Sequence, residues 1–554
     1  MHSGPMSGPS LLDPIRRRLA TAPGAPFVHI LRDGRSETLT NAALAEGAAR
    51  WAALLAADGC RPGEVVVLVL RHGPALYTAF LGAMLAGCVP AFLPFPTPRQ
   101  DPARYWDALD ALLRRSGAAC LIAGPEDTAA LRARLPRPAC RLRLPGEEAA
   151  MTPLAAWRGG AGDDIALLQH SSGTTGLQKG VALSHRAVLA QLDACAAAIG
   201  FAAGDVVASW LPLYHDMGLM ACFLLPLAKG GAVVSLDAFE WVARPALLPQ
   251  AIAAHRARWC WLPNFAFEHL ARHRRPEEWH DLSSIRAFID CSETCRAESL
   301  DRFAAGFADC GVTPDRLACC YAMAEAGFAV TQTPPGRPPP RLALAAEALA
   351  RGEARPASPG ERVATLLSVG RPVGGMALRI LGPDGMALPE GRIGEVALRG
   401  DSLFAGWHRQ PEASAAALRD GWYRTGDLGA LVGGELVVTG RRKEVILLRG
   451  RTLYAPDLEA AANRVPGVHP GRAAALGVPD PASGTEVLVL VAETDLTEEP
   501  ARRALARALR AALEAETGLG GAVAALRPPG WLVKTTSGKL SRAANLAKYL
   551  AEAA

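Results

Sequence analysis

The chain has 554 residues, half of them apolar and a fifth charged, which is typical of a globular protein and too long for one hydrophobic core. Its formal net charge of +5 comes from interspersed basic and acidic residues, which argues against binding to nucleic acid. The twelve cysteines include no Cys-x-x-Cys pair, so neither a zinc site nor a disulfide framework is indicated. We expect several domains, free thiols and a reducing, cytoplasmic location.

Two stretches bear on membrane targeting. Residues 1–19 contain three prolines and no apolar run, so they do not resemble a signal peptide. The most apolar window, residues 77–96, also contains three prolines and breaks near Gly87. A buried helix followed by a strand explains this window better than a membrane span. We therefore expect a protein that is not integral to a membrane.

Helices alternate with short apolar strands through the first part of the chain. Thr40 or Asn41 can cap the first of these helices, and Ser184 can begin another. The predicted helices cover 42–57, 75–87, 104–115, 185–199, 219–228 and 245–256. The predicted strands cover 65–70, 88–93, 118–123, 165–168, 206–210, 232–236, 259–262, 287–290 and 318–320. This alternation predicts an α/β fold with a parallel sheet covered on both faces.

Several predicted strands run directly into polar or aromatic residues. The loops concerned are 211–218, 263–265, 291–293 and 321–325. In open α/β sheets, ligands bind beyond the carboxyl ends of the strands. We therefore expect these four loops to line one site.

The loop 169–180 has the composition of a phosphate-binding turn. Its glycines allow close approach of backbone N–H groups to an anion, Thr174 and Thr175 can donate hydrogen bonds, and Lys179 adds a positive charge. It is not a P-loop, because Gln178 stands where that pattern needs glycine and Gly180 where it needs serine or threonine. A polar surface turn after a strand is the alternative.

The later part of the chain changes character twice. Residues 334–360 are rich in proline, with one short helix predicted near 342–351, and read as an insertion. Residues 368–438 contain short β-type segments separated by tight turns, which predicts a small β subdomain. Beyond 440–443, strands at 445–448, 473–478 and 487–492 precede an amphipathic helix, so we expect a separate C-terminal α+β domain over 444–554.

Five segments together resemble the adenylate-forming superfamily of acyl-CoA synthetases, luciferases and adenylation domains. They are the loop 171–180, Tyr321–Glu325, Gly421–Asp427, Gly440–Lys443 and Lys534–Lys539. Any one of these is a weak signal, but all five in this order are specific. The resemblance covers nearly the whole chain and implies an N-terminal domain over 1–439, a hinge at 440–443 and a mobile C-terminal domain.

Three further stretches resemble the fatty acyl-AMP ligase branch. They are Ser209–Gly218, Leu448–Arg451 and the insertion 334–360, a segment that in that branch disfavours free coenzyme A. Two stretches depart from it: Tyr454–Asp457 differs from Tyr-Pro-Gln-Asp, and Cys291–Thr294 differs from Gly-Ala-Glu-Pro. The departures bear on the acid substrate and the acyl acceptor rather than on adenylate formation.

The resemblance implies a first reaction in which a carboxylate attacks the α-phosphate of ATP, giving acyl-AMP and pyrophosphate. Two anions must meet, so catalysis rests on charge neutralisation and positioning. The residues implied to bind the nucleotide are Ser171, Thr174, Thr175, Lys179, Ser292, Tyr321, Asp427 and Arg441. Tyr321 would stack on adenine, and Asp427 would accept both ribose hydroxyls.

Three residues are implied to act in catalysis, namely Lys539, His215 and Glu325. Lys539 would neutralise charge between the two reactants, and Glu325 would hold Mg²⁺, a hard ion that prefers oxygen ligands. His215 either gates the acyl pocket or orients the carboxylate, or else it forms a structural pair with Asp216. Lys443 would be the hinge about which the small domain rotates.

The acyl pocket is assigned to Trp210, Met217, Asn264 and Phe265, with Phe267 also considered, although core packing explains the apolar residues among them equally well. The leading hypothesis is a fatty acyl-AMP ligase that uses ATP and Mg²⁺ and loads an acyl carrier protein. The alternatives are an acyl-CoA synthetase that uses free coenzyme A and a non-catalytic nucleotide-binding homologue.

Overall fold

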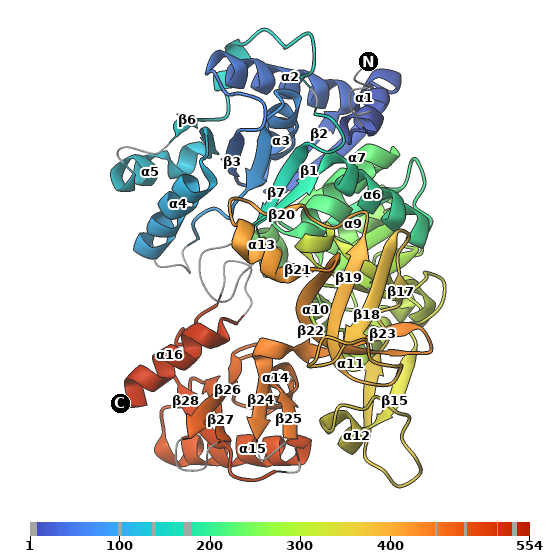
Figure 1. Ribbon diagram of the computed structural model, residues 1–554, viewed down its shortest axis with the longest axis vertical. Coiled ribbons are helices and arrows are strands. Elements are labelled where there is room, and N and C mark those ends of the chain that lie inside the picture. The colour runs from blue at the N-terminus through green and yellow to red at the C-terminus, as the bar shows by residue number, and fades with distance from the viewer. Residues whose placement is uncertain are drawn as a thin grey trace.

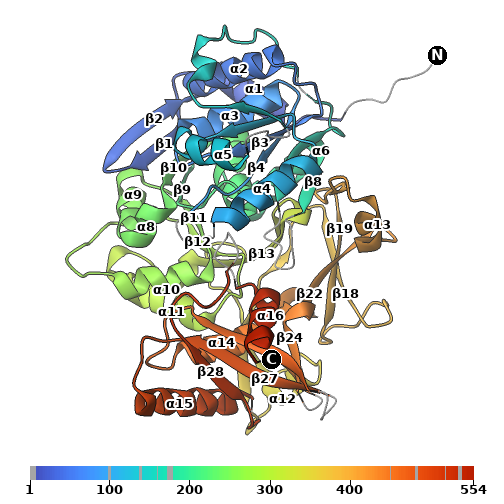
Figure 2. The same cartoon turned by 90° about the vertical axis from the view of Figure 1, so that its left-hand side faces the viewer.

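The computed structural model describes residues 8–553, apart from 98–101, 136–139, 159, 171–178, 449–450, 481–484, 518 and 535–539. The N-terminal elements form the upper part of Figure 1 and the last elements form the lower part. The same division is visible at right angles in Figure 2, where β18 and β19 stand to one side. Within the described ranges, no helix is long and apolar enough to cross a membrane.

The largest sheet has nine strands in the order β17-β14-β13-β12-β11-β9-β10-β1-β2. Its strands from β1 to β13 pair in parallel, whereas β2, β14 and β17 pair antiparallel at the two edges. The parallel part confirms the predicted α/β fold. The strands are β1 (Pro26–Arg32), β2 (Arg35–Thr40), β9 (Val206–Ser209), β10 (Ala232–Leu236), β11 (Trp259–Leu262), β12 (Ala287–Asp290), β13 (Leu317–Ala322), β14 (Ala329–Gln332) and β17 (Arg371–Pro372).

A second sheet has seven strands in the order β20-β8-β7-β4-β3-β5-β6. Its strands β3, β4, β5, β6 and β7 pair in parallel, and β8 and β20 complete one edge in antiparallel pairing. The strands are β3 (Val65–Val69), β4 (Val89–Phe92), β5 (Cys120–Ala123), β6 (Arg141–Arg143), β7 (Ile165–His170), β8 (Gly180–Ser184) and β20 (Gly406–Trp407).

The helices that cover these sheets begin largely where the sequence predicts. The Thr40 side chain accepts the N–H of Ala43, and the Ser184 side chain accepts the N–H of Ala187, so both predicted caps are confirmed. The longer helices are α1 (Leu12–Thr21), α2 (Asn41–Ala57), α3 (Pro74–Leu85), α4 (Pro102–Ser116), α6 (His185–Ile199), α9 (Leu247–His255), α10 (Asn264–His273) and α11 (Ala297–Gly306). Shorter ones are α5 (Thr128–Arg134), α8 (Ala238–Ala243) and α13 (Pro411–Ala417).

The predicted helix at 219–228 differs in kind from the observed one. The segment Met217–Leu224 is a π-helix, and α7 (Leu225–Lys229) continues it. The segment begins at a close approach, because a Cβ on Gly218 would lie 2.3 Å from the carbonyl oxygen of Pro212. π-Helical turns are frequent at functional sites, and this one follows directly after His215 and Asp216.

The insertion is a hairpin rather than a single helical piece. Arg341–Ala345 forms β15, which pairs antiparallel with β16 (Val363–Leu367), and only Ala346–Ala350 (α12) is helical. The helix predicted over 342–351 is therefore wrong for its first half. Pairing with β16, which lies further along the chain, outweighs the helix propensity of alanine and leucine.

The predicted β subdomain is confirmed as a five-stranded sheet. It has the order β18-β19-β22-β21, with β23 paired to β22. The strands are β18 (Met376–Leu381), β19 (Gly394–Gly400), β21 (Leu418–Arg419), β22 (Trp422–Val432) and β23 (Glu435–Arg441).

The C-terminal region, residues 445–553, has its own sheets and its own apolar clusters. Leu505, Leu509 and Leu513 are buried on one face of α15, which confirms the predicted amphipathic helix. The elements are β24 (Val445–Leu448), β25 (Arg451–Tyr454), α14 (Ala455–Asn463), β26 (Ala473–Asp480), β27 (Thr485–Glu493), α15 (Glu499–Thr517), β28 (Val523–Arg527) and α16 (Arg542–Ala553).

Two arginines from the preceding part of the chain contact this C-terminal region. Arg362 donates to the carbonyl oxygens of Ala515, at 3.0 Å, and Glu516, at the end of α15. Arg296 donates to the carbonyl oxygen of Pro456 and to the Asp457 carboxylate, at 3.0 and 3.1 Å. In Figure 1 the insertion hairpin accordingly lies beside the C-terminal elements.

Candidate active site

The buried carboxylate of Asp427 is the centre of a hydrogen-bonded cluster. Tyr321, near the end of β13, donates its hydroxyl to Asp427 Oδ2 at 2.5 Å. Arg441, at the end of β23, donates its Nε–H to Asp427 Oδ1 at 2.7 Å. Burial and then the charge of Asp427 raise the pKa of Tyr321 well above its ordinary value. The structure thus unites three predicted nucleotide-binding residues, and each carboxylate oxygen keeps a further lone pair for a hydroxyl group.

Glu325 lies next to this cluster, in the short helical turn Ala324–Ala326 that follows β13. Burial raises the pKa of its carboxyl group above the ordinary value of 4.5; among the charges that act on it, Arg441 lowers this pKa and Asp216 raises it. The hydroxyl of Tyr423 makes a hydrogen bond with Glu325. A carboxylate held in this way presents a fixed oxygen donor toward the site.

The residues present fit a magnesium ion bound mainly through a nucleotide. In the described part of the chain, no group of three or more His, Cys, Asp or Glu side chains is placed to hold a metal by itself. Mg²⁺ is commonly held by one or two carboxylates together with phosphate oxygens and water. Glu325 supplies such a carboxylate, and Asp216 acts on it electrostatically.

His215 forms a close pair with the residue that follows it. Its Nδ1 lies 2.8 Å from Asp216 Oδ1, and the same oxygen accepts the N–H of Met217. Both side chains are largely buried. The pairing fixes the imidazole ring just before the π-helix. A structural pair needs such a fixed ring, and so does a residue that orients the substrate carboxylate.

Ser292 occupies the loop after β12 in an unusual backbone conformation. Its φ is +71°, in the left-handed region that non-glycine residues seldom adopt. Its hydroxyl lies 4.0 Å from the sulfur of Met217, so this loop packs against the start of the π-helix. Backbone strain of this kind is found most often at binding sites.

Lys179 is the described member of the predicted phosphate loop. Its ammonium group lies 3.9 Å from the centroid of the Trp407 ring. Ser171, Thr174 and Thr175 lie outside the described residues, as does Lys539, so their predicted roles stay predictions.

A narrow cavity lies between the two large sheets, at the carboxyl ends of β3, β4, β9 and β10. Its volume is about 40 Å³, far below the roughly 300–1,000 Å³ of a typical small-molecule site, so in this structure it is a slender gap between side chains. Its wall at 210–214 leads directly to His215. The lining is mostly apolar and comprises Leu70, Leu76, Phe92, Leu93, Phe95, Trp210, Leu211, Pro212, Leu213, Tyr214, Leu236, Ala238 and Phe239.

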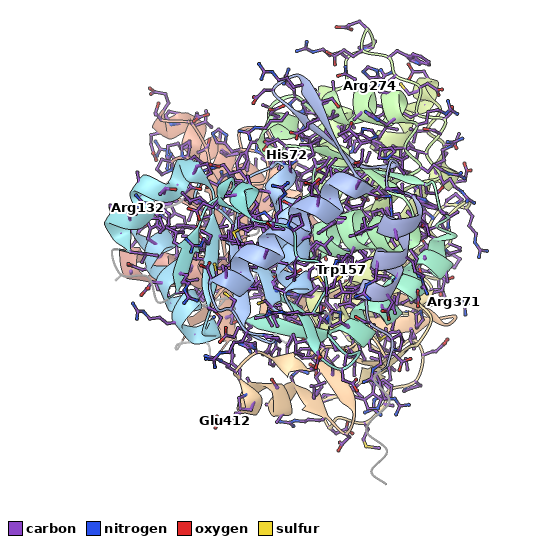
Figure 3. All side chains as sticks on the ribbon, turned by 90° about the horizontal axis from the view of Figure 1, so that it is seen from above. His72, Arg132, Trp157, Arg274, Arg371 and Glu412 are labelled. Carbon is purple, nitrogen blue, oxygen red and sulfur yellow. The ribbon has the colours of Figure 1, made fainter. Side chains whose placement is uncertain are left out.

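Four polar side chains also line this cavity. Tyr77 donates its hydroxyl to Ser235 Oγ at 2.9 Å and so ties helix α3 to strand β10. Asp237 helps, after burial, to raise the pKa of the Tyr214 hydroxyl to about 12. Burial lowers the pKa of His72, which is labelled near the middle of the view in Figure 3, whereas the labelled Arg132 and Arg274 lie toward its margins.

Of the four side chains predicted for the acyl pocket, only Trp210 lines this cavity, where it stacks on Trp241 with centroids 3.9 Å apart. Met217 is buried beneath Ser292, and Phe265 is 45% exposed. Asn264 bridges two helix starts, since it accepts the N–H of Arg296 and donates to Ser299. Phe267, also considered, is buried against Phe303.

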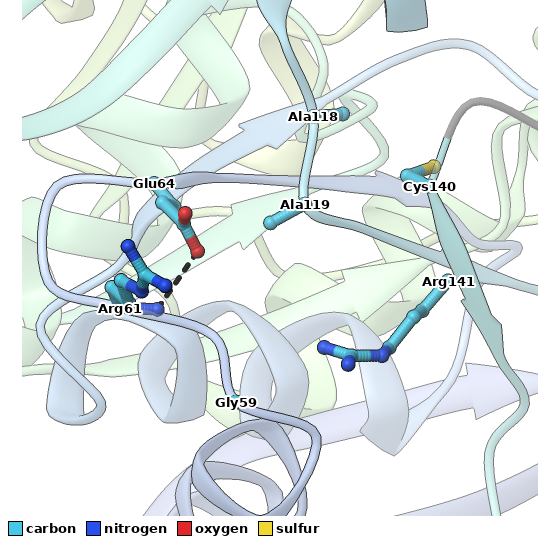
Figure 4. A pocket seen from close by; sticks show the side chains of 7 residues that line it. All are labelled: Gly59, Arg61, Glu64, Ala118, Ala119, Cys140 and Arg141. Atoms are coloured by element: carbon cyan, nitrogen blue, oxygen red, sulfur yellow. Dashed lines mark hydrogen bonds between the residues drawn. The ribbon is translucent and has the colours of Figure 1, made fainter.

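A second hollow, shown in Figure 4, is open and polar. It lies at the amino ends of β3 and β5, beside Arg61, Glu64, Cys140 and Arg141. Ligands of open α/β sheets bind at the opposite ends of the strands. This hollow is therefore separate from the site at Asp427 and Glu325.

Three residues that act on or contact Glu325 were not predicted as site residues. Asp216 acts on Glu325, and Tyr423 contacts it directly. Phe404 donates its backbone N–H to the carbonyl oxygen of Glu325 at 2.9 Å. Tyr423 lies within the Gly421–Asp427 segment, so its motif was recognised while its contact was not. Phe404 belongs to no recognised motif, and its aromatic character alone does not indicate a site.

The AMP-binding enzyme family model matches residues 15–408. The chain is 32% identical to a putative acyl-CoA synthetase of Caulobacter vibrioides, covering 95% of this chain and 92% of that protein. It is 31% identical to a long-chain fatty acid–AMP ligase of Mycobacterium marinum, covering 88% and 87%. A solved structure from a study of fatty acyl-adenylate ligases of E. coli and L. pneumophila matches with a TM-score of 0.92 at 28% identity, over 98% of both chains. The chain therefore belongs to the AMP-binding enzyme family and is an adenylate-forming ligase of the fatty acyl-AMP ligase type.

Proposed function

We propose that this enzyme joins a fatty or similar carboxylic acid to AMP and then transfers the acyl group to the phosphopantetheine thiol of an acyl carrier protein. The observation that carries the proposal is the adjacency of three features: the Asp427 cluster, the Glu325 carboxylate and an apolar cavity whose wall leads into His215. A ribose, a metal-bound phosphate and an acyl chain would each have a matching surface there.

In the proposed first step, a carboxylate oxygen of the acid forms a bond to the α-phosphorus of ATP. The bond from this phosphorus to the bridging oxygen breaks, and pyrophosphate leaves with the electron pair. Tyr321 would hold the adenine, and Asp427, with Arg441 beside it, would hold the ribose. When bound at Glu325, Mg²⁺ would neutralise charge on the phosphate oxygens.

The remaining roles rest on the resemblance of the motifs. Ser171, Thr174, Thr175 and Lys179 would bind the β- and γ-phosphates. Ser292 would contact the nucleotide, and His215 would orient the carboxylate. Lys539 would neutralise the charge that develops between the two reactants, which is an electrostatic role.

The C-terminal part of the chain would move between the two reactions. We assign residues 1–439 to the N-terminal domain, 440–443 to a hinge that includes Lys443, and 444–554 to a mobile domain that carries Lys539. Rotation of this domain would withdraw Lys539 and open the adenylate to a thiol.

The acid is tested with purified protein, ATP, Mg²⁺ and a panel of carboxylic acids, with acyl-adenylate detected by mass spectrometry and pyrophosphate release followed in parallel. Ala238 lines the cavity, and Ala243 is exposed on the same helix. Ala238→Phe is expected to lower kcat/KM about tenfold for the longest acids accepted and to leave short acids unaffected, because the ring occupies cavity space.

Ala243→Phe is the matched control, since it adds the same ring outside the cavity. The placement of the acyl chain would be contradicted if Ala238→Phe lowered kcat/KM equally for long and short acids. It would also be contradicted if Ala238→Phe left kcat/KM unchanged for all of them. Failure of every acid to give an adenylate in the unaltered protein would refute the activity itself.

The acyl acceptor is tested by offering coenzyme A and a phosphopantetheinylated carrier protein separately. Arg362 connects the insertion hairpin to the end of α15. Arg362→Ala is expected to raise the ratio of acyl-CoA to acyl-carrier product about threefold, because loss of two hydrogen bonds, about 1 kcal/mol each, loosens the C-terminal region. The rate of adenylate formation is expected to change little.

Arg351→Ala is the control, because Arg351 is exposed on the same insertion. Rapid formation of acyl-CoA by the unaltered enzyme would favour the alternative, an acyl-CoA synthetase. An unchanged product ratio in Arg362→Ala would mean that this contact does not influence acceptor choice.

A further inference from the structure

The ammonium group of Lys179 lies over an aromatic face. Its Nζ lies 3.9 Å from the centroid of the Trp407 ring, well within the 6 Å range of cation–π attraction. Trp407 comes from a distant part of the chain but is paired with β8, the strand that begins directly after the lysine. In the pairing of β20 with β8, Trp407 lies opposite Val181. The backbone N–H of His408 donates to the carbonyl oxygen of Gly180 at 2.7 Å.

The Trp407 ring is itself held in place. Its backbone N–H donates to Ser414 Oγ at 2.8 Å. Phe404 packs edge-on against the ring at 5.3 Å between centroids, and Tyr423 does so at 6.4 Å. The indole N–H is buried and has no protein partner in the described ranges of the chain. The ring orientation is therefore set by packing, not by a hydrogen bond of the indole.

The same aromatic residues also support Glu325. The Phe404 backbone N–H donates to the Glu325 carbonyl oxygen at 2.9 Å, and the Tyr423 hydroxyl makes a hydrogen bond with its carboxylate. Phe404 and Tyr423 pack edge-on at 5.1 Å. Phe404, Trp407 and Tyr423 thus form one aromatic group. The group contacts both the Lys179 cation and the Glu325 anion.

We propose that Trp407 is a positioning residue that holds the ammonium group of Lys179 ready for the phosphates of ATP. A lysine side chain has four rotatable bonds. Ordering it on binding costs about 1.5–2 kcal/mol of conformational free energy. The ring face removes part of this cost before ATP arrives. The inference rests on the proposed function of Lys179.

The test compares Trp407→Phe with Trp407→Leu in the full-length enzyme, assayed by ATP-dependent pyrophosphate release. Phenylalanine keeps a weaker π face, and leucine has none. The KM for ATP is expected to rise about threefold in Trp407→Phe and about tenfold in Trp407→Leu. The KM for the acid and the melting temperature are expected to be alike in the two variants.

A double-mutant cycle with Lys179→Gln separates positioning from packing. If Trp407 acts through the lysine, Trp407→Leu adds no further increase in the KM for ATP once Lys179 is glutamine. Trp157→Leu is the matched control, because it removes another cation–π contact, with Arg16 at 4.9 Å, outside the site. No change in KM is expected for it.

Three results would overturn the proposal in distinguishable ways. Trp407 would act by packing alone if Trp407→Phe and Trp407→Leu raised the KM for ATP equally. The same conclusion would follow if Trp407→Leu still raised this KM in the Lys179→Gln background. An altered KM in Lys179→Gln with none in Trp407→Leu would leave the phosphate role of Lys179 intact and remove the positioning role. An unchanged KM in Lys179→Gln would remove both.

Discussion

Replacing Asp427 with alanine is expected to lower kcat/KM for ATP about a thousandfold, because it removes a buried, charged acceptor to which two donors point. The Tyr321 hydroxyl and the Arg441 guanidinium would lose their partner, and the ribose would lose its acceptor. Burial of Asp427, which is 3% exposed, makes replacement by water inefficient. Exchange of labelled pyrophosphate into ATP measures the loss.

Two further variants identify the cause of that loss. Asp427→Asn keeps the shape but places an amide N–H₂ against one of the two donors, so a loss of comparable size is expected from charge and polarity alone. Asp401→Ala removes an exposed carboxylate elsewhere on the β subdomain and should behave like the unaltered enzyme. An unchanged KM for ATP in both Asp427 variants would contradict the ribose assignment.

Glu325→Gln is expected to lower the rate of adenylate formation about a hundredfold and to raise the Mg²⁺ concentration needed for half-maximal rate, because a neutral amide binds a hard cation weakly. The hydrogen bond with Tyr423 can persist through the amide oxygen. Glu412→Gln, on the exposed surface near the margin of Figure 3, is the control. A Mg²⁺ dependence that does not change would contradict the metal assignment.

Glu325→Gln is also expected to change the pH profile of adenylate formation. Burial raises the pKa of Glu325 above 4.5, so its carboxyl group takes up a proton at a higher pH than an exposed glutamate does. Activity that requires the carboxylate therefore falls as the pH is lowered through this raised pKa and recovers as the pH increases. Glu325→Gln should lose this acidic limb, and an identical limb in the variant would assign it to another group.

Much of the fold follows from local rules. The helix that begins at Asn41 is set by the Thr40 cap, and the strand Val65–Val69 is set by a continuous β-branched and leucine run. The rule that ligands bind at the carboxyl ends of parallel strands also brings together the regions of His215, Ser292 and Tyr321. These features depend on short stretches of sequence.

The features that were not predicted depend on contacts between distant segments. The strand at 341–345 exists because Val363–Leu367 lies beside it, and alanine and leucine do not reveal that partner. Phe265 and Trp210 are both aromatic and lie near strand ends, yet Phe265 is 45% exposed and Trp210 lines the cavity. The contact between Lys179 and Trp407 likewise joins residues that no local pattern connects.

The two-residue strand β20 has a consequence for how the polypeptide can be shortened. It covers the outer edge of β8, although most of the polypeptide between them folds elsewhere. A fragment that stops before residue 405 would leave the backbone N–H and C=O groups of β8 unsatisfied along that edge, and bare edges promote aggregation. Any dissection of this enzyme into fragments should therefore retain residues 405–408 with the N-terminal half.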